Sequence, residues 1–186
     1  MRFSAGIVAI TAAMANALVP AIQYSASLND LTTLTQSLLG PASRISVANL
    51  PQFMTGTGPA ITFISGITQV ITLSSNVVGN EALSNGGASG GADTDKLLTS
   101  IQQFSLTQQQ LLGTIDDKKV LFTNSPIVSG MFSAVFIALK TSVDNLLTTA
   151  IGSLSGTGAA NANDSLNTLN AALDTAIATF SAALPQ

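Results

Sequence analysis

The residues best suited to chemistry in this sequence lie together in the segment TIDDKKVLFTNSP, residues 114–126. The segment contains Asp116, Asp117, Lys118 and Lys119, although only 8% of the 186 residues are charged. A carboxylate pair can serve as general acid and base, and a lysine with a lowered pKa can act as a nucleophile. Both roles need a buried setting that shifts the pKa of the group. These four residues are therefore the first candidates for an active site.

The rest of the composition argues against an enzyme. The chain has no histidine and no cysteine, which removes the usual general base at neutral pH, the thiolate nucleophile and the ligands of most zinc sites. Asp93 and Asp95 supply too few oxygen ligands for calcium and are expected to lie at a helix N-terminus instead. The glycines of 86–91 are not followed by the Lys-Ser/Thr of a phosphate-binding loop. We therefore expect no catalytic residue, no cofactor and no metal site.

The charged cluster has two further interpretations, neither of which involves catalysis. It follows a predicted helix, so it is expected to form a solvated helix end in which Asp116 and Lys119 are spaced for a weak ion pair. Alternatively, one of its lysines binds the carboxylate of a fatty acid at the mouth of a pocket.

The N-terminus has the pattern of a secretory signal peptide. Arg2 is followed by the apolar run 5–14 and by Ala-Asn-Ala at 15–17, a cleavage site of the small-x-small type. The apolar run is too short for a membrane anchor. We therefore predict a signal peptide over 1–17 and a secreted, extracellular mature chain over 18–186. That length suits a single domain with one hydrophobic core.

The charge of the mature chain limits its partners. Because Arg2 is one of the six basic residues, its removal leaves five basic against nine acidic residues, a net charge of −4. An acidic chain lacks the basic surface that binds a nucleic acid or an anionic membrane, so neither is expected as a partner. No transmembrane segment is expected in the mature chain, because the longest later apolar stretch, 127–139, contains two serines and a glycine and ends at Lys140.

Residues that break regular structure divide the mature chain into segments of helix length. They cluster at 40–43, 56–59, 84–93, 123–126 and 155–163. Between these loops, apolar residues recur at intervals of three and four, as in an amphipathic helix. Helices are predicted over 21–39, from Asp93 or Thr94 through Ile115, from Ser125 and Pro126 through Ile151, and from Asn163 or Asp164 onward.

Residues 61–73, ITFISGITQVITL, are ambiguous. Their β-branched residues nearly alternate, as in a strand, yet Ile61, Ile64, Ile71 and Val78 also fit one face of a helix. A lone strand would have no partner for its backbone hydrogen bonds, so we predict a helix here. The predicted fold class is all-α, an antiparallel helical bundle of about five to six helices.

Several segments, taken in order, resemble one protein family. They are the signal peptide, LNDLTTLTQSLL at 28–39, a Gln-rich helix ending in LLGTIDDKKVLF, and SPIVSGMFSAVFIALKTSVDNLL at 125–147, followed by a terminal helix of small residues. This order resembles the fungal hydrophobic surface-binding protein A family, which is similar to the cell-wall galactomannoproteins. The resemblance is sharpest over 104–147. It implies a secreted protein that adsorbs to hydrophobic surfaces or resides in the cell wall, and some relatives hold a fatty acid inside the bundle.

The candidate contacts with a lipid or a hydrophobic surface lie on both sides of the charged cluster. They are Phe104, Leu111, Ile115, Phe122, Met131, Phe132, Val135, Phe136 and Leu139. By default the phenylalanines are expected in the core, and a pocket lining is the alternative. Asn163, in the sequon Asn-Asp-Ser, is a candidate N-glycosylation site, although the same residues also suit a helix cap.

Three functions remain open at this point. The first is a secreted, non-enzymatic protein that adsorbs to hydrophobic surfaces or resides in the fungal cell wall, since weakly polar helix faces lose little hydration on contact. The alternative is a soluble module that encloses a fatty acid or another lipid between its helices. A second alternative is a structural cell-wall mannoprotein, with wall polysaccharide as its partner.

Overall fold

The computed structural model describes residues 4–81, 91–122 and 126–182, with side chains placed over 21–79, 91–122 and 127–182. The helices in chain order are α1 (Ser4–Arg44), the 3-10 helix η1 (Val47–Asn49), α2 (Leu50–Met54), α3 (Gly58–Glu81), α4 (Ala92–Asp116), α5 (Lys119–Phe122), α6 (Pro126–Ile151) and α7 (Gly156–Ser181). This described part of the chain contains helices and turns and no strand. The predicted all-α class is confirmed.

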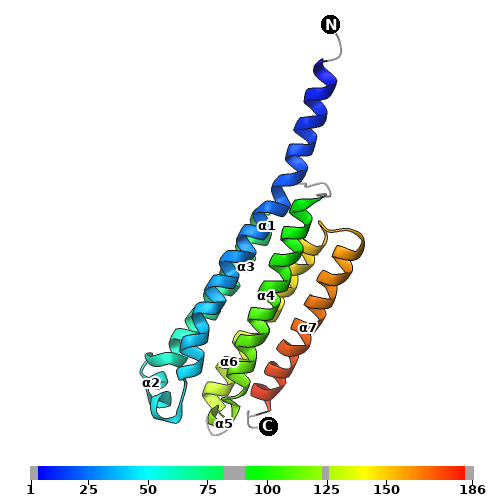
Figure 1. Cartoon of the computed structure of the whole chain (residues 1–186). Helices are drawn as coiled ribbons and strands as arrows, with labels where there is room; N and C mark the ends of the chain where they lie inside the picture. The colour runs from blue at the N-terminus through cyan, green and yellow to red at the C-terminus, as the bar shows by residue number, and fades with distance from the viewer. Residues whose placement is uncertain (1–3, 82–90, 123–125, 183–186) are drawn as a thin grey trace.

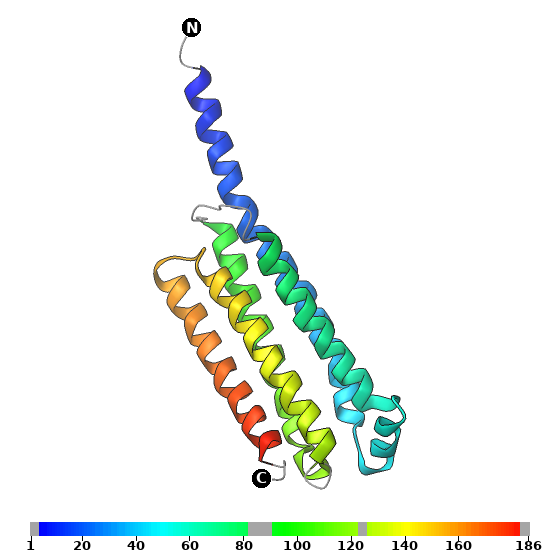
Figure 2. The same ribbon diagram turned by 180° about the vertical axis from the view of Figure 1, so that it is seen from behind.

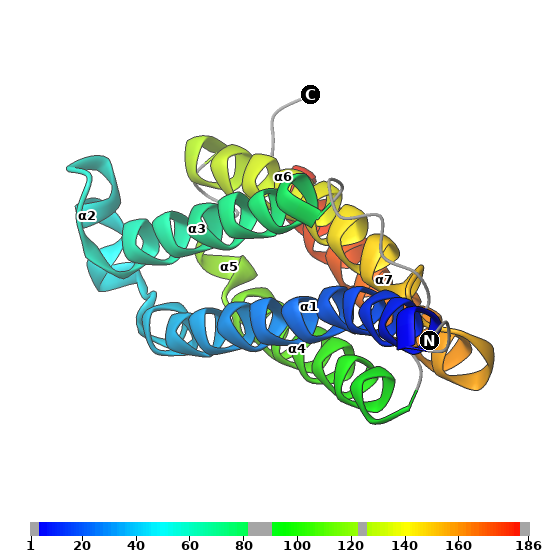
Figure 3. The same ribbon diagram turned by 90° about the horizontal axis from the view of Figure 1, so that it is seen from above.

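The long helices form a ring around a common core. α1 packs on α3 and α4, α6 packs on α3 and α7, and α4 packs on α7. Figure 3 shows the ring from above, with α1 and α4 on one side and α3 and α6 on the other. The short helices α2 and α5 lie at the end of the bundle away from the N-terminus (Figure 1). The interior of the ring is therefore bounded by all of the long helices.

Long helices that follow one another in the chain run in opposite directions, whereas some helices that are neighbours in the ring run in the same direction. α1, α4 and α7 run in one direction, and α3 and α6 run in the other (Figures 1 and 2). The neighbours α1 and α3, and α6 and α7, are therefore antiparallel, whereas α1 and α4, α4 and α7, and α3 and α6 are parallel. Helices α3 and α4, which follow one another in the chain, are thus not packing neighbours in the ring, and neither are α4 and α6.

The N-terminal part of α1 projects beyond the ring (Figure 1). Among the residues whose side chains are placed, those of α1 that line the core run from Ala21 to Ala42. The predicted signal peptide over 1–17 precedes all of them. Cleavage before Leu18 would therefore leave the packed part of α1 intact, and the signal peptide itself stays a prediction.

The loop predicted over 40–43 is wrong, because α1 continues to Arg44. Ala42 is fully buried, so tertiary packing outweighs the low helix propensity of Gly40 and Pro41. Nε of Arg44 also donates a hydrogen bond to the carbonyl of Gly40 at 3.2 Å. This contact adds a side-chain hydrogen bond to the last turn of α1.

The loop predicted over 155–163 is also wrong, because α7 begins at Gly156. Ser155 precedes the helix in an extended conformation, and Ala162 is fully buried, so the small residues of this segment pack as the first turns of α7. Asn163 therefore does not cap the helix. Its side chain is exposed, and Nδ2 donates to a backbone carbonyl one turn earlier at 2.9 Å. Glycosylation of Asn163 stays a prediction.

Residues 61–73 lie inside α3, which confirms the helix predicted there. The face that α3 buries differs from the expected one. Phe63, Ile67 and Val70 are fully buried. The predicted set of Ile61, Ile64, Ile71 and Val78 is only partly buried at the edges of the core. A helix with apolar residues on most of its circumference does not indicate its buried face by periodicity alone.

The starts of α4 and α6 agree with the sequence, whereas the helix predicted over 21–39 extends in both directions, over Ser4–Arg44. α4 begins at Ala92 and α6 at Pro126, within two residues of the predicted positions. Ser125, the predicted N-cap of α6, and most of the predicted loop 84–93 lie outside the described residues.

Two glycines determine how α3 starts and how it packs. Gly58, its first residue, has a φ of 86°, a value that residues with a side chain rarely adopt. A Cβ at Gly66 would lie only 2.1 Å from Cδ2 of Leu38 in α1. The lack of a side chain at Gly66 thus allows α1 and α3 to approach closely.

Two helices meet the length and composition of a membrane span. These are 58–79 in α3 and 127–151 in α6, each with a mean hydropathy of 1.4. In the ring, 28% and 44% of these stretches are buried. Core helices of a bundle meet the same criterion, so the expected absence of a transmembrane segment in the mature chain stays a prediction.

Candidate functional site

A cluster of phenyl rings fills the interior of the bundle near α5. Phe132 of α6 is its centre, and its ring centroid lies 4.7 Å from Phe122, 5.3 Å from Phe180, 5.6 Å from Phe63 and 6.0 Å from Phe136. Each of these five rings is at most 1% exposed. Because Phe122 belongs to α5, which contacts α6 and α7, its ring closes this end of the interior.

Most of the predicted contact residues lie in this buried core. The fully or almost fully buried ones are Phe104, Leu111, Ile115, Phe122, Phe132, Phe136 and Leu139. Val135 is half-buried against the core, and Met131 is 41% exposed. The buried residues line the interior of the ring, so a ligand reaches them only when helices move apart.

A buried polar pair, which the sequence analysis did not single out, joins α1 to α4. Thr35 and Gln108 are 0% and 1% exposed, and Nε2 of Gln108 donates to Oγ1 of Thr35 at 2.9 Å. Oγ1 of Thr35 in turn donates to the carbonyl of Leu31 at 2.8 Å. Oε1 of Gln108 has no hydrogen-bond partner among the described residues. Buried polar atoms nearly always have one, so this oxygen requires an explanation.

The sequence contains a signal for this pair, namely one gap in each apolar stripe. Buried apolar residues of α4 recur at 97, 101, 104, 111 and 115, and those of α1 at 24, 28, 31, 38 and 42. Gln108 and Thr35 fill the single missing position in each series of alternating three- and four-residue steps. Both side chains therefore lie on the stripes that their helices present to the core.

Hydroxyl groups make several of the other contacts between helices. The pairs of Oγ atoms are Ser25 with Ser100 at 2.8 Å, Ser75 with Ser142 at 2.9 Å, and Ser133 with Ser181 at 2.8 Å. Most exposed threonines donate instead to a carbonyl of their own helix, as Thr68 does to Ile64 at 2.9 Å. The helices thus meet through apolar and uncharged polar groups, with few ion pairs.

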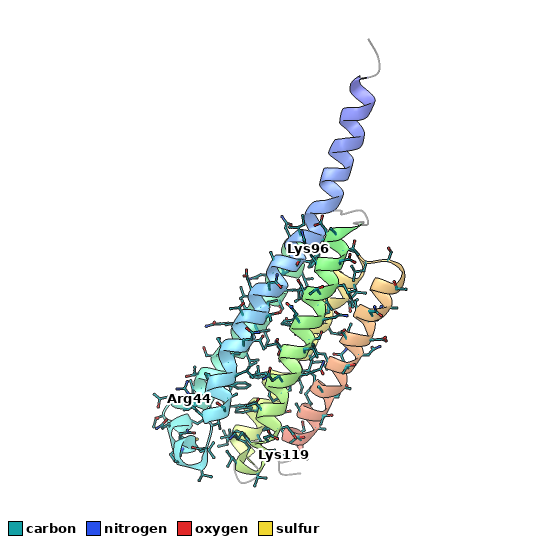
Figure 4. The ribbon with its side chains drawn as sticks, in the orientation of Figure 1. Arg44, Lys96 and Lys119 are labelled. Atoms are coloured by element: carbon teal, nitrogen blue, oxygen red, sulfur yellow. The ribbon has the colours of Figure 1, made fainter. Side chains whose placement is uncertain are left out.

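The charged side chains lie at the surface of the part of the chain that the structure describes. Nζ of Lys119 is 2.9 Å from Oδ2 of Asp116, the ion pair predicted from their spacing, and Lys119 is half exposed. Figure 4 shows Lys119 and Arg44 at one end of the bundle and Lys96 at the other. The cluster at 116–119 thus forms the expected solvated helix end and provides no buried lysine.

The hollows found on the described surface are open grooves. One of about 420 Å³ runs between α1 and α3, past Leu38 and Gly66. Another of about 510 Å³ lies along α3 beside Thr68 and Leu73. Neither groove is lined by Gln108 or by the phenyl cluster. The residues that line the interior of the ring are buried, so access to it requires a change in the helix packing.

Two solved structures share this fold. AfMP4p in complex with palmitic acid superposes with a TM-score of 0.65 at 18% identity, over 86% of this chain and 99% of that chain. Ligand binding domain 1 of the Penicillium marneffei MP1 protein, complexed with arachidonic acids, gives a TM-score of 0.72 at 10% identity, over 87% of this chain and 98% of that one. No protein-family model and no curated protein sequence matches the chain.

The likeness establishes a class of fold rather than a family. At these identities it shows that the chain is a helical bundle of the architecture found in those two fungal ligand complexes. Membership of the hydrophobic surface-binding protein A family stays a prediction from the sequence resemblance.

Proposed function

We propose that the chain is a non-enzymatic lipid-binding protein that takes a fatty acid, or another lipid with a single acyl chain, into the interior of the helix ring. The proposal depends above all on one observation. Over most of its length the chain shares its fold with two proteins solved with palmitic acid and with arachidonic acids. The fatty-acid alternative therefore has more support than adsorption to surfaces.

The interior away from the phenyl cluster has the composition that an acyl chain needs. It is lined by aliphatic residues in the middle of α1, near the N-terminal ends of α4 and α7 and near the C-terminal end of α6. They include Leu28, Leu97, Ile101, Val143, Leu147, Ala150, Ala162 and Leu166. Each methylene group that leaves water for such a setting contributes about 0.8 kcal/mol. The free energy gained by burying a long acyl chain can thus offset the free energy lost when apolar contacts between the helices separate.

Entry of a ligand breaks few strong contacts between helices. Across the α1–α4 and α3–α6 pairs the polar contacts are between uncharged groups, such as Ser25 with Ser100 and Ser75 with Ser142. A hydrogen bond of this type contributes only about 0.5–1.5 kcal/mol net, and the hydroxyls can find water when helices part. Such an interior opens at a lower cost than one held by buried ion pairs.

Secretion is part of the same proposal. The segment 1–17 has the pattern of a signal peptide and precedes the core residues of α1, so the mature chain keeps the whole described core. A carrier outside the cell, or one held in the cell wall, meets lipids released into the medium.

Adsorption to hydrophobic surfaces is the second candidate, and one observation favours it. Val47, Met54, Val120 and Ile127 are 64–71% exposed. They belong to η1, α2, α5 and the first turn of α6, which lie at the end of the bundle away from the N-terminus (Figure 1). Large apolar side chains gathered at one end provide a contact area for wax or a lipid film.

One experiment separates these candidates. The mature protein, stripped of lipid in organic solvent and refolded, is titrated with palmitic acid, and in parallel it is mixed with octyl-coated beads at low and high salt. We expect saturable, stoichiometric binding of palmitic acid. Depletion by the beads that persists at high salt, without binding of palmitic acid, would support adsorption instead. If neither is observed, both proposals are wrong.

A further inference from the structure

Gln108 occupies a position at which the fold calls for an apolar residue. Its neighbours on the inner stripe of α4 are Phe104 and Leu111, both buried, and Gln108 itself is 1% exposed. Its carboxamide nevertheless leaves Oε1 without a protein donor in the part of the chain that the structure describes. A buried acceptor without a donor destabilises the folded state, whereas leucine at the same position would not. The residue thus has a cost in stability that packing does not explain.

The hydrogen bond to Thr35 does not remove this cost. The hydroxyl of Thr35 donates to the carbonyl of Leu31, so it accepts from Nε2 of Gln108 and has no second proton for Oε1. Exchanging the amide oxygen and nitrogen of Gln108 would leave the NH2 group facing the same interior instead. In either orientation one end of the carboxamide remains available, and Thr35 holds the amide in place.

The surroundings of Gln108 exclude a charged partner. Gln108 is on α4, which packs between α1 and α7, with α3 and α6 across the ring. The charged side chains placed on these helices are all exposed or half-buried: Asp30, Arg44, Asp93, Asp95, Lys96, Asp116, Lys140, Asp144, Asp164 and Asp174. Tyr24, the buried phenol of α1, precedes Thr35 by three helical turns, about 16 Å along the axis. With no cation on the inner stripes, a carboxylate placed beside Gln108 would be buried without a counter-charge.

We propose that the carboxamide of Gln108, held by Thr35, is the head-group subsite for a single-chain lipid, and that it accepts a hydrogen bond from an uncharged hydroxyl. The hydroxyl belongs to a protonated fatty acid or to a fatty alcohol. A protonated carboxyl group matches a carboxamide well, because its O–H donates to Oε1 while its carbonyl accepts from the NH2 group. The inference rests on the proposed function and specifies the protonation state in which an acid is bound.

This assignment makes fatty-acid affinity depend on pH in a defined direction. A free carboxylic acid has a pKa close to that of a glutamic acid side chain, about 4.3. Binding the neutral form raises the pKa of the bound acid, so affinity is greatest below the free pKa and falls as pH rises above it. The chain has no histidine and no cysteine, so its own side chains change charge little between about pH 5.5 and about pH 7.5. A change of affinity with pH in this range therefore reports the protonation of the ligand.

The test compares an acid with an alcohol of the same length on the wild-type mature chain. Decanoic acid and 1-decanol, which remain soluble as monomers at low concentration, are titrated by calorimetry at about pH 5.5 and about pH 7.5. We expect the affinity for decanoic acid to fall by up to about 100-fold between the two conditions, while that for 1-decanol stays constant. If the acid binds equally well at both pH values, the subsite is wrong while the proposed function stands. If neither ligand nor palmitic acid binds at any pH, the proposed function itself is wrong.

Two variants then test whether Gln108 is the group responsible. Gln108→Leu removes the carboxamide and keeps the volume, and Gln110→Leu makes the same change at an exposed position of α4. We expect Gln108→Leu to lower the affinity for 1-decanol roughly tenfold, the equivalent of one hydrogen bond, and Gln110→Leu to leave it unchanged. Circular dichroism of both variants checks that the fold is retained. Equal affinities of the two variants for 1-decanol would overturn the assignment, and the pH series on the wild-type chain tests it even if Gln108→Leu fails to fold.

Discussion

Replacing Phe132 with alanine is the sharpest test of the core that the structure describes. The ring of Phe132 is fully buried and packs against Phe122, Phe180, Phe63 and Phe136. These partners come from α3, α5, α6 and α7, so Phe132 joins separate helices rather than consecutive turns of one helix. Its removal leaves a void that no single helix can fill by a small shift.

The expected loss lies at the upper end of the range for core truncations. Phe→Ala changes in protein cores cost about 3–5 kcal/mol, because the transfer free energy and a cavity term add. Aromatic pairs add about 0.5–1.5 kcal/mol each beyond the buried area, although contacts that share one ring are not additive. We therefore expect Phe132→Ala to lower the free energy of unfolding by about 4–5 kcal/mol. For a domain of this size the corresponding fall in Tm is about 8–20 °C.

Urea and thermal unfolding followed by circular dichroism at 222 nm measure this loss. Met131→Ala is the matched control, because Met131 is the preceding residue of α6 and is 41% exposed. We expect that change to cost less than about 1 kcal/mol. Phe132→Leu, which keeps most of the apolar volume, should cost about 1.5 kcal/mol or less. If Phe132→Ala is no more damaging than Met131→Ala, the phenyl cluster is not the centre of the core.

Two further predictions concern the contact of α1 with α3 and the charged cluster. Gly66→Ala gains about 1 kcal/mol of helix propensity but forces a new Cβ against Leu38. We therefore expect this change to lower the free energy of unfolding in urea by about 1–2 kcal/mol in the wild-type background. In a Leu38→Ala background, where the clash is absent, the same change should raise the free energy of unfolding. A stabilising Gly66→Ala in the wild-type background would contradict the close approach. Replacing Asp116, Asp117, Lys118 and Lys119 together with alanine should change stability by no more than about 1 kcal/mol and leave palmitic acid binding intact, because the ion pair is exposed. Loss of binding in that variant would show that a lysine of the cluster holds the ligand.

Much of the fold can be predicted from the sequence because apolar spacing is a local property. The stripes of α4 and α7, from Leu97 to Ile115 and from Leu166 to Phe180, give the helix type and the buried face together. α3 shows the limit of this approach. Its apolar residues surround most of the helix, so its type was predicted correctly and its buried face was not.

The two wrong loops have a common physical cause. Gly40-Pro41 and the segment 155–163 contain the residues that usually end helices, yet Gly40-Pro41 lies inside α1 and 156–163 lies inside α7. In a helix interior, glycine is less favourable than alanine by about 1 kcal/mol and proline by about 3 kcal/mol. The burial of Ala42 and Ala162 shows that tertiary contacts outweigh these terms at both places. Such contacts depend on neighbouring helices and are not visible in the local sequence.

The polar pair marks a different kind of limit. The polar residues Thr35 and Gln108 interrupt the apolar stripes of their helices in the sequence. A single polar residue in such a stripe is, however, also compatible with an exposed position or with a bend in the helix. The pair has meaning only because α1 and α4 are parallel neighbours whose register places the two side chains 2.9 Å apart. Because α3 lies between α1 and α4 in the chain, no short turn between the two helices sets that register. Stability alone would favour leucine at Gln108, so the buried carboxamide is the observation from which we propose the head-group subsite.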